Sequence, residues 1–458
     1  MSFYSATLPY QPDVSRYYAA LADLPWAIWL DSGGMARYDI LAAAPYRTLM
    51  LDESVTQSDP FGLLRDALGE QVAPVDGVPF AGGALGYWGY DLARRMMILP
   101  RIAHVDAPMP DMAVGIYDWA VVLDHQMHTA RLVSHQRFAE TVEFLPQVLC
   151  RLQNPPPLPA ASFRVRGPIT SNFSGESYAA AFAAVQAYLR AGDCYQINLA
   201  QRFSAQAEGD AFGAYLALRD LSPAPYSAFL NLPRAQILCV SPECFVSVQN
   251  GRVRTKPIKG TRPRGSDARQ DRLLAEELRT HPKDRAENLM IVDLLRNDLG
   301  KSCLPGSVHV PGLFKVESFA NVHHLVSTVE GQLAPERDAL DVLRDCFPGG
   351  SVTGAPKLRA MQIIEQLEPH RRGVYCGAIG YIGFDGNMDS NVAIRTMVHN
   401  HDRIHCWAGG GIVADSELAA EYQETLDKAS AMLELLQRCG GRDMRATETT
   451  AQPFNQPE

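Results

Sequence analysis

The chain has 458 residues, of which 47% are apolar and 20% are charged, a composition that excludes collagen-like, low-complexity and disordered proteins. With 42 Lys and Arg against 51 Asp and Glu, the formal net charge is −9. This charge disfavours a protein that binds nucleic acid or anionic lipid by general attraction, so any basic site must be local.

The cysteines and the N-terminal residues indicate the compartment. Nine cysteines are scattered without a C-x-x-C pair, so neither a disulfide framework nor a zinc site is predicted. The first residues, MSFYSATLPYQPD, lack a basic region followed by an apolar core, and no stretch of about 20 apolar residues occurs. We therefore expect a cytoplasmic protein that contacts neither membrane nor nucleic acid.

Composition divides the chain into four segments. Residues 1–150 show short apolar strands between Gly-rich turns and are expected to form a mostly-β subdomain. A Pro-rich linker is predicted over 151–168, a larger catalytic domain over 169–439, and a disordered tail over 440–458.

Beyond the linker, long helices alternate with pairs of strands. The clearest helix is Ser177–Ala191, which Gly192 ends, and Asn250-Gly251 predicts the turn of a β-hairpin. Further helices are predicted over 267–279, 283–297 and 355–368, and strands over 376–384, 392–400 and 403–408. The expected fold is α+β, with large antiparallel sheets packed as a sandwich-like core and helices on the flanks.

The last predicted helix runs over 417–438, with Ser416 as its N-cap. Glu421, Glu424 and Lys428 share one of its faces, at spacings of three to four residues. Acid pairs at this spacing usually face solvent. A third carboxylate, such as Glu287 in the preceding helical segment DRAENLM, would instead allow a hard cation such as Mg²⁺ to bind.

The most basic segment is GRVRTKPIKGTRPRG, residues 251–265, which has six cations and no acid. It is either a solvated hairpin or an anchor for phosphate or carboxylate. Lys259 stands between Ile258 and Gly260 near a strand end, where burial and neighbouring cations would lower the pKa of its amine. An uncharged lysine is a nucleophile.

Glu243, in the tripeptide SPE, lies across the same hairpin. A turn centred on Asn250-Gly251 pairs Glu243 with Ile258, so regular pairing would point Glu243 and Lys259 to opposite faces. Both can serve one site only if the ladder breaks, and Pro242 or Pro257 is where we expect the break.

Two Gly-rich segments, FPGGSVTGAPK and WAGGGIVADS, are predicted as turns before helices. Their backbone N–H groups could hold a carboxylate, or the turns could be merely structural. Arg395 projects from the apolar segment NVAIRTM and needs an anionic partner, either a structural carboxylate or a ligand. His324 is equally compatible with a core position and with a site.

Taken together, these motifs resemble those of the chorismate-utilising enzymes. The resemblance runs in order through LDSGGMARYDILAAAP, GDCYQINLAQRF, SPE, PIKGTRPRG, DRAENLMIVDLLRNDLG, HHLVS, GGSVTGAPK, YCGAIGY, NVAIRTM, GGGIVADS and EYQETLDKA. It covers nearly the whole chain. The resemblance implies an enzyme with the family's chorismate-binding fold.

Two positions indicate which chemistry the resemblance implies. Lys259 stands where the otherwise similar anthranilate synthases typically carry alanine, and Gln196 stands where isochorismate and salicylate synthases place a lysine base. The resemblance therefore implies a transferase that aminates chorismate at its fourth ring carbon, giving 4-amino-4-deoxychorismate for 4-aminobenzoate and folate synthesis. The alternatives are an anthranilate synthase component and a non-catalytic, anion-binding or regulatory protein of the same fold.

The resemblance also implies a role for each residue of the site. Lys259 would be the covalent nucleophile and Glu243 the general acid, while Glu287 and Glu424, supported by Glu421, would hold Mg²⁺. The implied substrate-binding residues are Arg395, Tyr375, Gly410, Gly411, Ser351, His324, Lys428 and Gln196.

The implied ammonia donor is a separate glutamine amidotransferase subunit, forming a stable or transient heterodimer. The family motifs occupy about residues 25–431 and leave no room for an amidotransferase domain. The N-terminal part resembles the region that holds a tryptophan pocket in anthranilate synthases, and whether this chain binds an amino acid there stays open.

Overall fold

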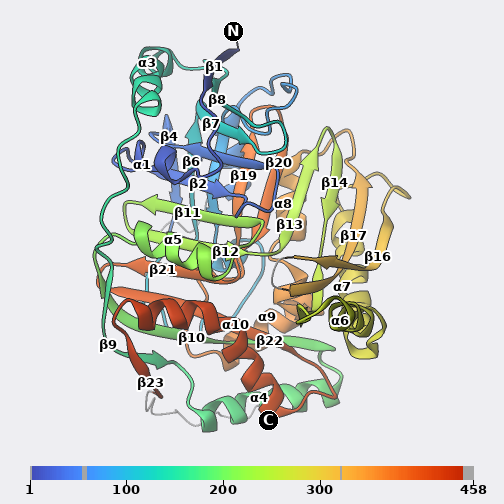
Figure 1. Ribbon diagram of the computed structural model, residues 1–458. Coiled ribbons are helices and arrows are strands. Elements are labelled where there is room, and N and C mark those ends of the chain that lie inside the picture. The colour runs from blue at the N-terminus through green and yellow to red at the C-terminus, as the bar shows by residue number, and fades with distance from the viewer. Residues whose placement is uncertain (1–2, 54–58, 320–321, 447–458) are drawn as a thin grey trace.

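Two large, mostly antiparallel sheets form the centre of the molecule, and helices pack on their outer faces (Figure 1). The computed structural model describes residues 3–53, 59–319 and 322–446. This arrangement confirms the α+β prediction. Within those ranges, no helix combines the length and the apolar composition that crossing a bilayer requires.

The larger sheet has 13 strands. In spatial order they are β1 (Tyr4–Leu8), β8 (Thr129–Ser134), β7 (Trp119–Asp124), β3 (Tyr38–Ala42), β2 (Ala27–Asp31), β11 (Tyr226–Leu232), β12 (Ala235–Ser241), β21 (Thr396–Asn400), β22 (Arg403–Ile412), β10 (Gln196–Glu208), β9 (Arg164–Ser171) and β23 (Arg442–Ala446), with β18 (Gly354–Ala355) paired to β10. Among the described strands of this sheet, β23 and β9 are the pair that runs in parallel.

The smaller sheet has ten strands. Their order is β15 (Ile258–Pro263), β17 (Val322–Gln332), β14 (Arg252–Thr255), β13 (Cys244–Gln249), β20 (Met388–Val392), β19 (Ala378–Gly383), β5 (Gly83–Trp88), β6 (Met112–Tyr117) and β4 (Arg47–Leu51), and β16 (His309–Ser318) pairs with β17. The Asn250-Gly251 turn joins β13 to β14 as predicted.

The helices are α1 (Ser15–Ala19), α2 (Pro60–Leu68), α3 (Ala139–Gln153), α4 (Gly175–Ala191), α5 (Phe212–Leu221), α6 (Ala268–Thr280), α7 (Pro282–Gly300), α8 (Ala339–Cys346), α9 (Lys357–Leu367) and α10 (Leu418–Arg438), with short 3₁₀ turns η1 (Tyr90–Arg95) and η2 (Gly350–Val352). Helix α4 confirms the prediction, because Ser174 caps its start and Gly192 ends it in the left-handed conformation.

The alternation of side chains along each strand creates two cores. On β2, Ile28 belongs to the core between the sheets, whereas Ala27 and Trp29 belong to the core between the larger sheet and its helices. Both faces of β2 are therefore buried, which explains its uninterrupted apolar run from Ala27 to Leu30.

Strands from both sides of the Pro-rich segment pair directly with one another. β2 pairs with β11 in the larger sheet, and β5 pairs with β19 in the smaller one. Residues 154–163 between α3 and β9 have no regular structure. The division into subdomains stays a prediction. Of the predicted tail, Arg442–Ala446 forms β23 and residues 447–458 lie outside the described residues.

Three local predictions are wrong. The strand predicted over 392–400 is interrupted between β20 and β21, where Arg395 has a φ of 48° that an extended strand does not allow. Gly409–Gly411 lie inside β22 and form no turn. Glu417, not Ser416, precedes α10; the Ser416 hydroxyl instead donates a hydrogen bond to Glu421.

Candidate active site

Lys259 lies in β15 with its amine directed inward. Its Nζ donates a hydrogen bond to the backbone carbonyl of Ser351, at 3.2 Å. Burial lowers the pKa of Lys259, and Lys428 lowers it further, while the carboxylates of Glu287, Glu243 and Glu424 oppose the shift. The amine is therefore easier to deprotonate than an ordinary lysine, as the sequence predicts for a nucleophile.

Glu243 reaches the same place as Lys259. Its carboxyl accepts hydrogen bonds from the Ser351 hydroxyl and from the backbone N–H of Ile258, and burial raises its pKa. β13 starts only at Cys244, and the pairing of β15 with β17 shifts register just after Ile258. The ladder thus breaks near Pro242 and Pro257, as predicted, and the break allows both side chains to serve one site.

The three predicted metal ligands come from two helices. Glu287 lies in α7, and Glu421 and Glu424 lie in α10. The Lys283 amine lies 4.0 Å from Glu287 Oε1 and 3.6 Å from Glu421 Oε1. Lys428 pairs with Glu424 at 2.6 Å and also donates to the Gly409 carbonyl.

The three carboxylates differ in how burial and neighbouring charges act on them. Burial raises the pKa of Glu287, and Glu424 adds to this effect. Burial also acts to raise the pKa of Glu424, but its ion pair with Lys428 more than offsets this and leaves the pKa lowered. Glu421 is almost fully buried at 2% exposure, so the solvent-facing alternative does not hold for it.

The carboxylates fit a hard cation by chemistry. Among the described residues, no three His, Cys, Asp or Glu side chains converge closely enough to form a metal site by themselves. Glu421 Oε2, however, is buried and has no hydrogen-bond partner in the described part of the chain. A carboxylate oxygen without a hydrogen-bond partner is suited to a divalent cation. Here this oxygen lies next to a lysine that pairs with two glutamates, and water and substrate oxygens would complete the coordination shell of the cation.

The other wall of the site is formed by β10, β22 and the segment before β19. Tyr375 stacks on Trp407 of β22, with ring centroids 6.0 Å apart. A Cβ on Gly410 would lie 2.9 Å from Glu421 Oε2, and one on Gly411 would lie 2.8 Å from Gln196 Nε2. Gln196 is fully buried, and both of its amide atoms lack a partner among the described residues.

Arg395 and His324 lie next to each other at the edge of the site. Arg395 forms no side-chain hydrogen bond or ion pair with another described residue, and burial lowers its pKa. Burial, Arg395 and His323 lower the pKa of His324 to about 4. His324 Nδ1 is 2.9 Å from the Thr261 hydroxyl, two residues beyond Lys259. The predicted anionic partner of Arg395 is therefore better supplied by a ligand than by the protein.

The sequence predictions missed Lys283 and Thr261. The i, i+4 spacing of Lys283 and Glu287 is a signal that could have revealed the first. Thr261 lies two residues beyond Lys259, but the register of β15 shifts between Ile258 and Thr261, so regular alternation does not predict the direction of its side chain. Nothing in the sequence indicates its contact with His324.

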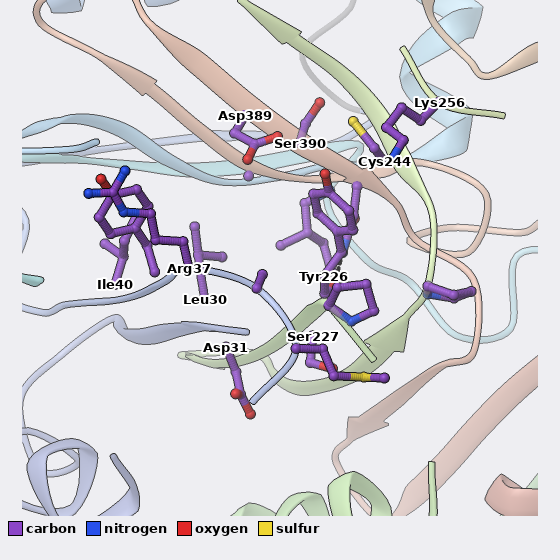
Figure 2. Close-up of a pocket in the computed structure, with 18 of the residues that line it drawn as sticks. Leu30, Asp31, Arg37, Ile40, Tyr226, Ser227, Cys244, Lys256, Asp389 and Ser390 are labelled. Carbon is purple, nitrogen blue, oxygen red and sulfur yellow. Dashed lines mark hydrogen bonds between the residues drawn. The ribbon is translucent and has the colours of Figure 1, made fainter. Parts of the chain in front are cut away.

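A separate cavity of about 390 Å³ lies behind this site (Figure 2). Pro242, Cys244 and Ile258 line it, whereas Glu243 and Lys259 do not. Figure 2 shows Tyr226, Cys244, Asp389 and Arg37 around the cavity. Burial raises the pKa of Asp389 to about 7, and its Oδ1 has no partner in the described part of the chain.

Comparison with known proteins places the chain in one family. Residues 26–434 match the family described as chorismate binding enzyme. Aminodeoxychorismate synthase component 1 from Klebsiella aerogenes is 48% identical over 450 residues, which cover 94% of this chain and 98% of that protein.

Anthranilate synthases are more distant. Component 1 from Streptomyces coelicolor is 41% identical over 89% of this chain and 82% of that protein. The crystal structure of anthranilate synthase component I from Streptococcus pneumoniae has a TM-score of 0.79 at 36% identity, covering 87% of this chain and 92% of that one.

Proposed function

The chain belongs to the family of chorismate binding enzymes, and from this premise we propose that it is component 1 of an aminodeoxychorismate synthase. It replaces the hydroxyl group at the fourth ring carbon of chorismate with an amino group, for 4-aminobenzoate and folate synthesis. The observation that carries the proposal is the buried amine of Lys259, held by Ser351 beside the buried carboxyl of Glu243.

Binding orients chorismate by its two carboxylates. Arg395, which has no partner among the residues that the structure describes, suits the enolpyruvyl carboxylate, together with Tyr375 and the backbone at Gly410 and Gly411. The ring then lies next to Ser351 and His324, while Lys428 and Gln196 bound the site on the side of β22. A charged ligand in a largely buried site requires such paired contacts.

The first chemical step uses Lys259 as the nucleophile. The uncharged amine attacks the second ring carbon, the ring double bonds shift, and the carbon–oxygen bond at the fourth ring carbon breaks. Glu243, whose pKa burial raises, acts as the general acid and gives a proton to the departing hydroxyl, which leaves as water. The amine of the covalent adduct loses its extra proton to complete the balance.

The second step reverses the first with a different nucleophile. Ammonia attacks the fourth ring carbon, the double bonds return, and the bond between Lys259 and the second ring carbon breaks. Glu243, now ionised, accepts a proton from the incoming nitrogen, and Lys259 leaves as an amine after reprotonation. The enolpyruvyl group is retained, so no pyruvate is released.

Magnesium is part of the proposal. Glu287 and Glu424, with Glu421 in support, would hold Mg²⁺, which would reduce the charge penalty of bringing a dianion among these carboxylates. The Lys283 amine lies near Glu287 and Glu421 and would compete with the cation for these carboxylates.

The ammonia donor in the proposal is a glutamine amidotransferase subunit in the cytoplasm. The relatives' designation as component 1 supports a second component. Because ammonia itself is the attacking species, a high ammonium concentration should replace that subunit in vitro.

The test is to incubate the purified chain with chorismate, Mg²⁺ and concentrated ammonium at mildly alkaline pH and to identify the product by mass. A chorismate-derived amine that keeps the enolpyruvyl carbons supports the proposal. Anthranilate with pyruvate would overturn it in favour of the anthranilate synthase alternative. No turnover, even with an amidotransferase subunit and glutamine, would favour a non-catalytic protein.

A further inference from the structure

Arg372 and Glu368 form an ion pair in the wall of the candidate site, although neither side chain lines the reacting groups. Their side chains are 1% and 4% exposed, and Arg372 Nη2 lies 2.6 Å from Glu368 Oε1. A second hydrogen bond joins Arg372 Nε to Glu368 Oε2 at 2.9 Å. Such a buried, bidentate pair is costly to desolvate and is strongly destabilising to break from one side.

The pair holds the backbone of two separate segments. Arg372 Nη1 donates to the Val352 carbonyl at 2.8 Å, and Nη2 donates to the Asn198 carbonyl at 2.6 Å. Glu368 Oε1 accepts from the Ala200 N–H at 2.9 Å. All three guanidinium nitrogens are thereby used in fixed directions, which a lysine amine cannot reproduce.

Each of these segments carries residues of the proposed reaction. Val352 follows Ser351, which binds Lys259 and Glu243. Asn198 and Ala200 follow Gln196 on β10 and face Gly411 and Gly409 of β22. The Arg372 guanidinium also lies 5.8 Å from the ring centroid of Tyr375. One ion pair therefore connects the Ser351 segment, β10 and the segment that carries Tyr375.

We propose that Arg372, oriented by Glu368, is a positioning residue that fixes the Ser351 segment against β10 and so places Lys259 and Glu243 relative to bound chorismate. The inference rests on the proposed function. A displacement of about 1 Å in this segment would cost roughly 10- to 100-fold in rate.

The principal variant is Arg372→Lys, which retains the positive charge beside Glu368 but not the three hydrogen-bond directions. The matched control is Arg94→Lys. Arg94 is 8% exposed, pairs with Asp91 and with Glu365 of helix α9, and donates to the Pro100 carbonyl. Among the described residues, none of its hydrogen bonds reaches the Ser351 segment or β10. Both variants lose one buried guanidinium network, so their losses in Tm should be comparable.

The expected result is a kcat reduced roughly 10- to 100-fold in Arg372→Lys, with a smaller change in KM for chorismate, while Arg94→Lys keeps kcat within about twofold of the unmodified enzyme. Equal kcat values for the two variants would overturn the proposal. If Arg372→Lys does not fold, Glu368→Gln replaces it. The glutamine retains the Oε1 acceptor, so it should retain more kcat than Glu368→Ala, and equal losses would contradict the positioning role.

Hydrogen–deuterium exchange gives a readout that does not depend on turnover. Peptides covering residues 196–200 and 349–353 should exchange faster in Arg372→Lys than in Arg94→Lys, because the tether between them is lost. Unchanged exchange in both peptides would overturn the proposal even if amination is observed. If the unmodified chain does not form the amine, the proposed function is rejected. The exchange result then still shows whether Arg372 holds the two segments together.

Discussion

The site around Lys259 and the cavity of Figure 2 lie on opposite sides of the same strand segments. Glu243 and Lys259 face the site, whereas their neighbours Cys244 and Ile258 line the cavity. The site is crowded with paired charges, among them Lys428 with Glu424. The cavity has a volume of about 390 Å³ and contains Asp389, whose Oδ1 has no partner in the described structure.

This difference shows that the open volume of a pocket and the shifted pKa values of its residues are separate properties. Open volume indicates room for a ligand, but shifted pKa values that arise from burial and close charge partners indicate chemistry. In this molecule the two lie side by side because successive residues of an extended segment point in opposite directions. The following variants test whether the chemistry belongs to the site around Lys259 and not to the cavity, from the largest expected effect to the smallest.

Lys259→Ala should have the largest effect. Loss of the nucleophile should reduce amine formation on the order of 10³-fold or more, measured by product mass at saturating chorismate. The control is Lys256→Ala, because Lys256 lies in the same basic segment but pairs with Glu317 and lines the cavity. Full activity in Lys259→Ala would remove the covalent lysine from the mechanism.

Glu243→Gln should reduce kcat by about 10²- to 10⁴-fold, because the amide cannot donate a proton to the departing hydroxyl. The matched control is Glu330→Gln, which changes another buried carboxylate of the smaller sheet, one that pairs with Arg252 and Arg254. A steady-state assay of both variants separates the two roles. If the losses of kcat are similar, Glu243 contributes to folding and not to proton transfer.

Glu424→Ala should raise the Mg²⁺ concentration needed for half-maximal activity by roughly 10- to 100-fold. A magnesium titration of the ammonium-dependent reaction measures this. Glu434→Ala on the same helix is the control, since Glu434 pairs with Arg438 at an exposed position. An unchanged titration curve for Glu424→Ala would mean that this carboxylate does not bind the metal.

Asp389→Asn should have the smallest effect, and only on stability. The folded protein raises the pKa of Asp389 to about 7 from an ordinary value of 3.8. An acid with a raised pKa stabilises the fold below its ordinary pKa, and this contribution is lost as pH rises through about 7. The variant should therefore melt a few degrees higher than the unmodified protein at pH 8 and at the same temperature at pH 4.

Thermal melts of Asp385→Asn give the comparison for Asp389, because Asp385 lies in the same hairpin and hydrogen-bonds Asn387. That variant should show no gain between pH 4 and pH 8. A gain of equal size would mean that the effect comes from the general charge of the hairpin and not from the buried carboxyl of Asp389.

Local sequence signals were sufficient where neighbouring residues decide the structure. Gly192 ends α4, and Asn250-Gly251 turns the hairpin, because helix ends and turns depend on a few adjacent residues. The prediction of one strand through Arg395 was wrong for the opposite reason. The backbone there turns so that Ala393 can hydrogen-bond Cys376 and Gly377, which are distant partners.

The sequence by itself determined the family, the α+β class and the residues with the required chemical groups, because motif order and residue type do not depend on coordinates. Only the tertiary structure decided how those groups meet. It broke the ladder so that Glu243 and Lys259 face one site, buried Glu421, and placed the Arg372–Glu368 pair between β10 and the Ser351 segment. Burial and long-range pairing set these pKa values and contacts, and neither can be read from sequence spacing.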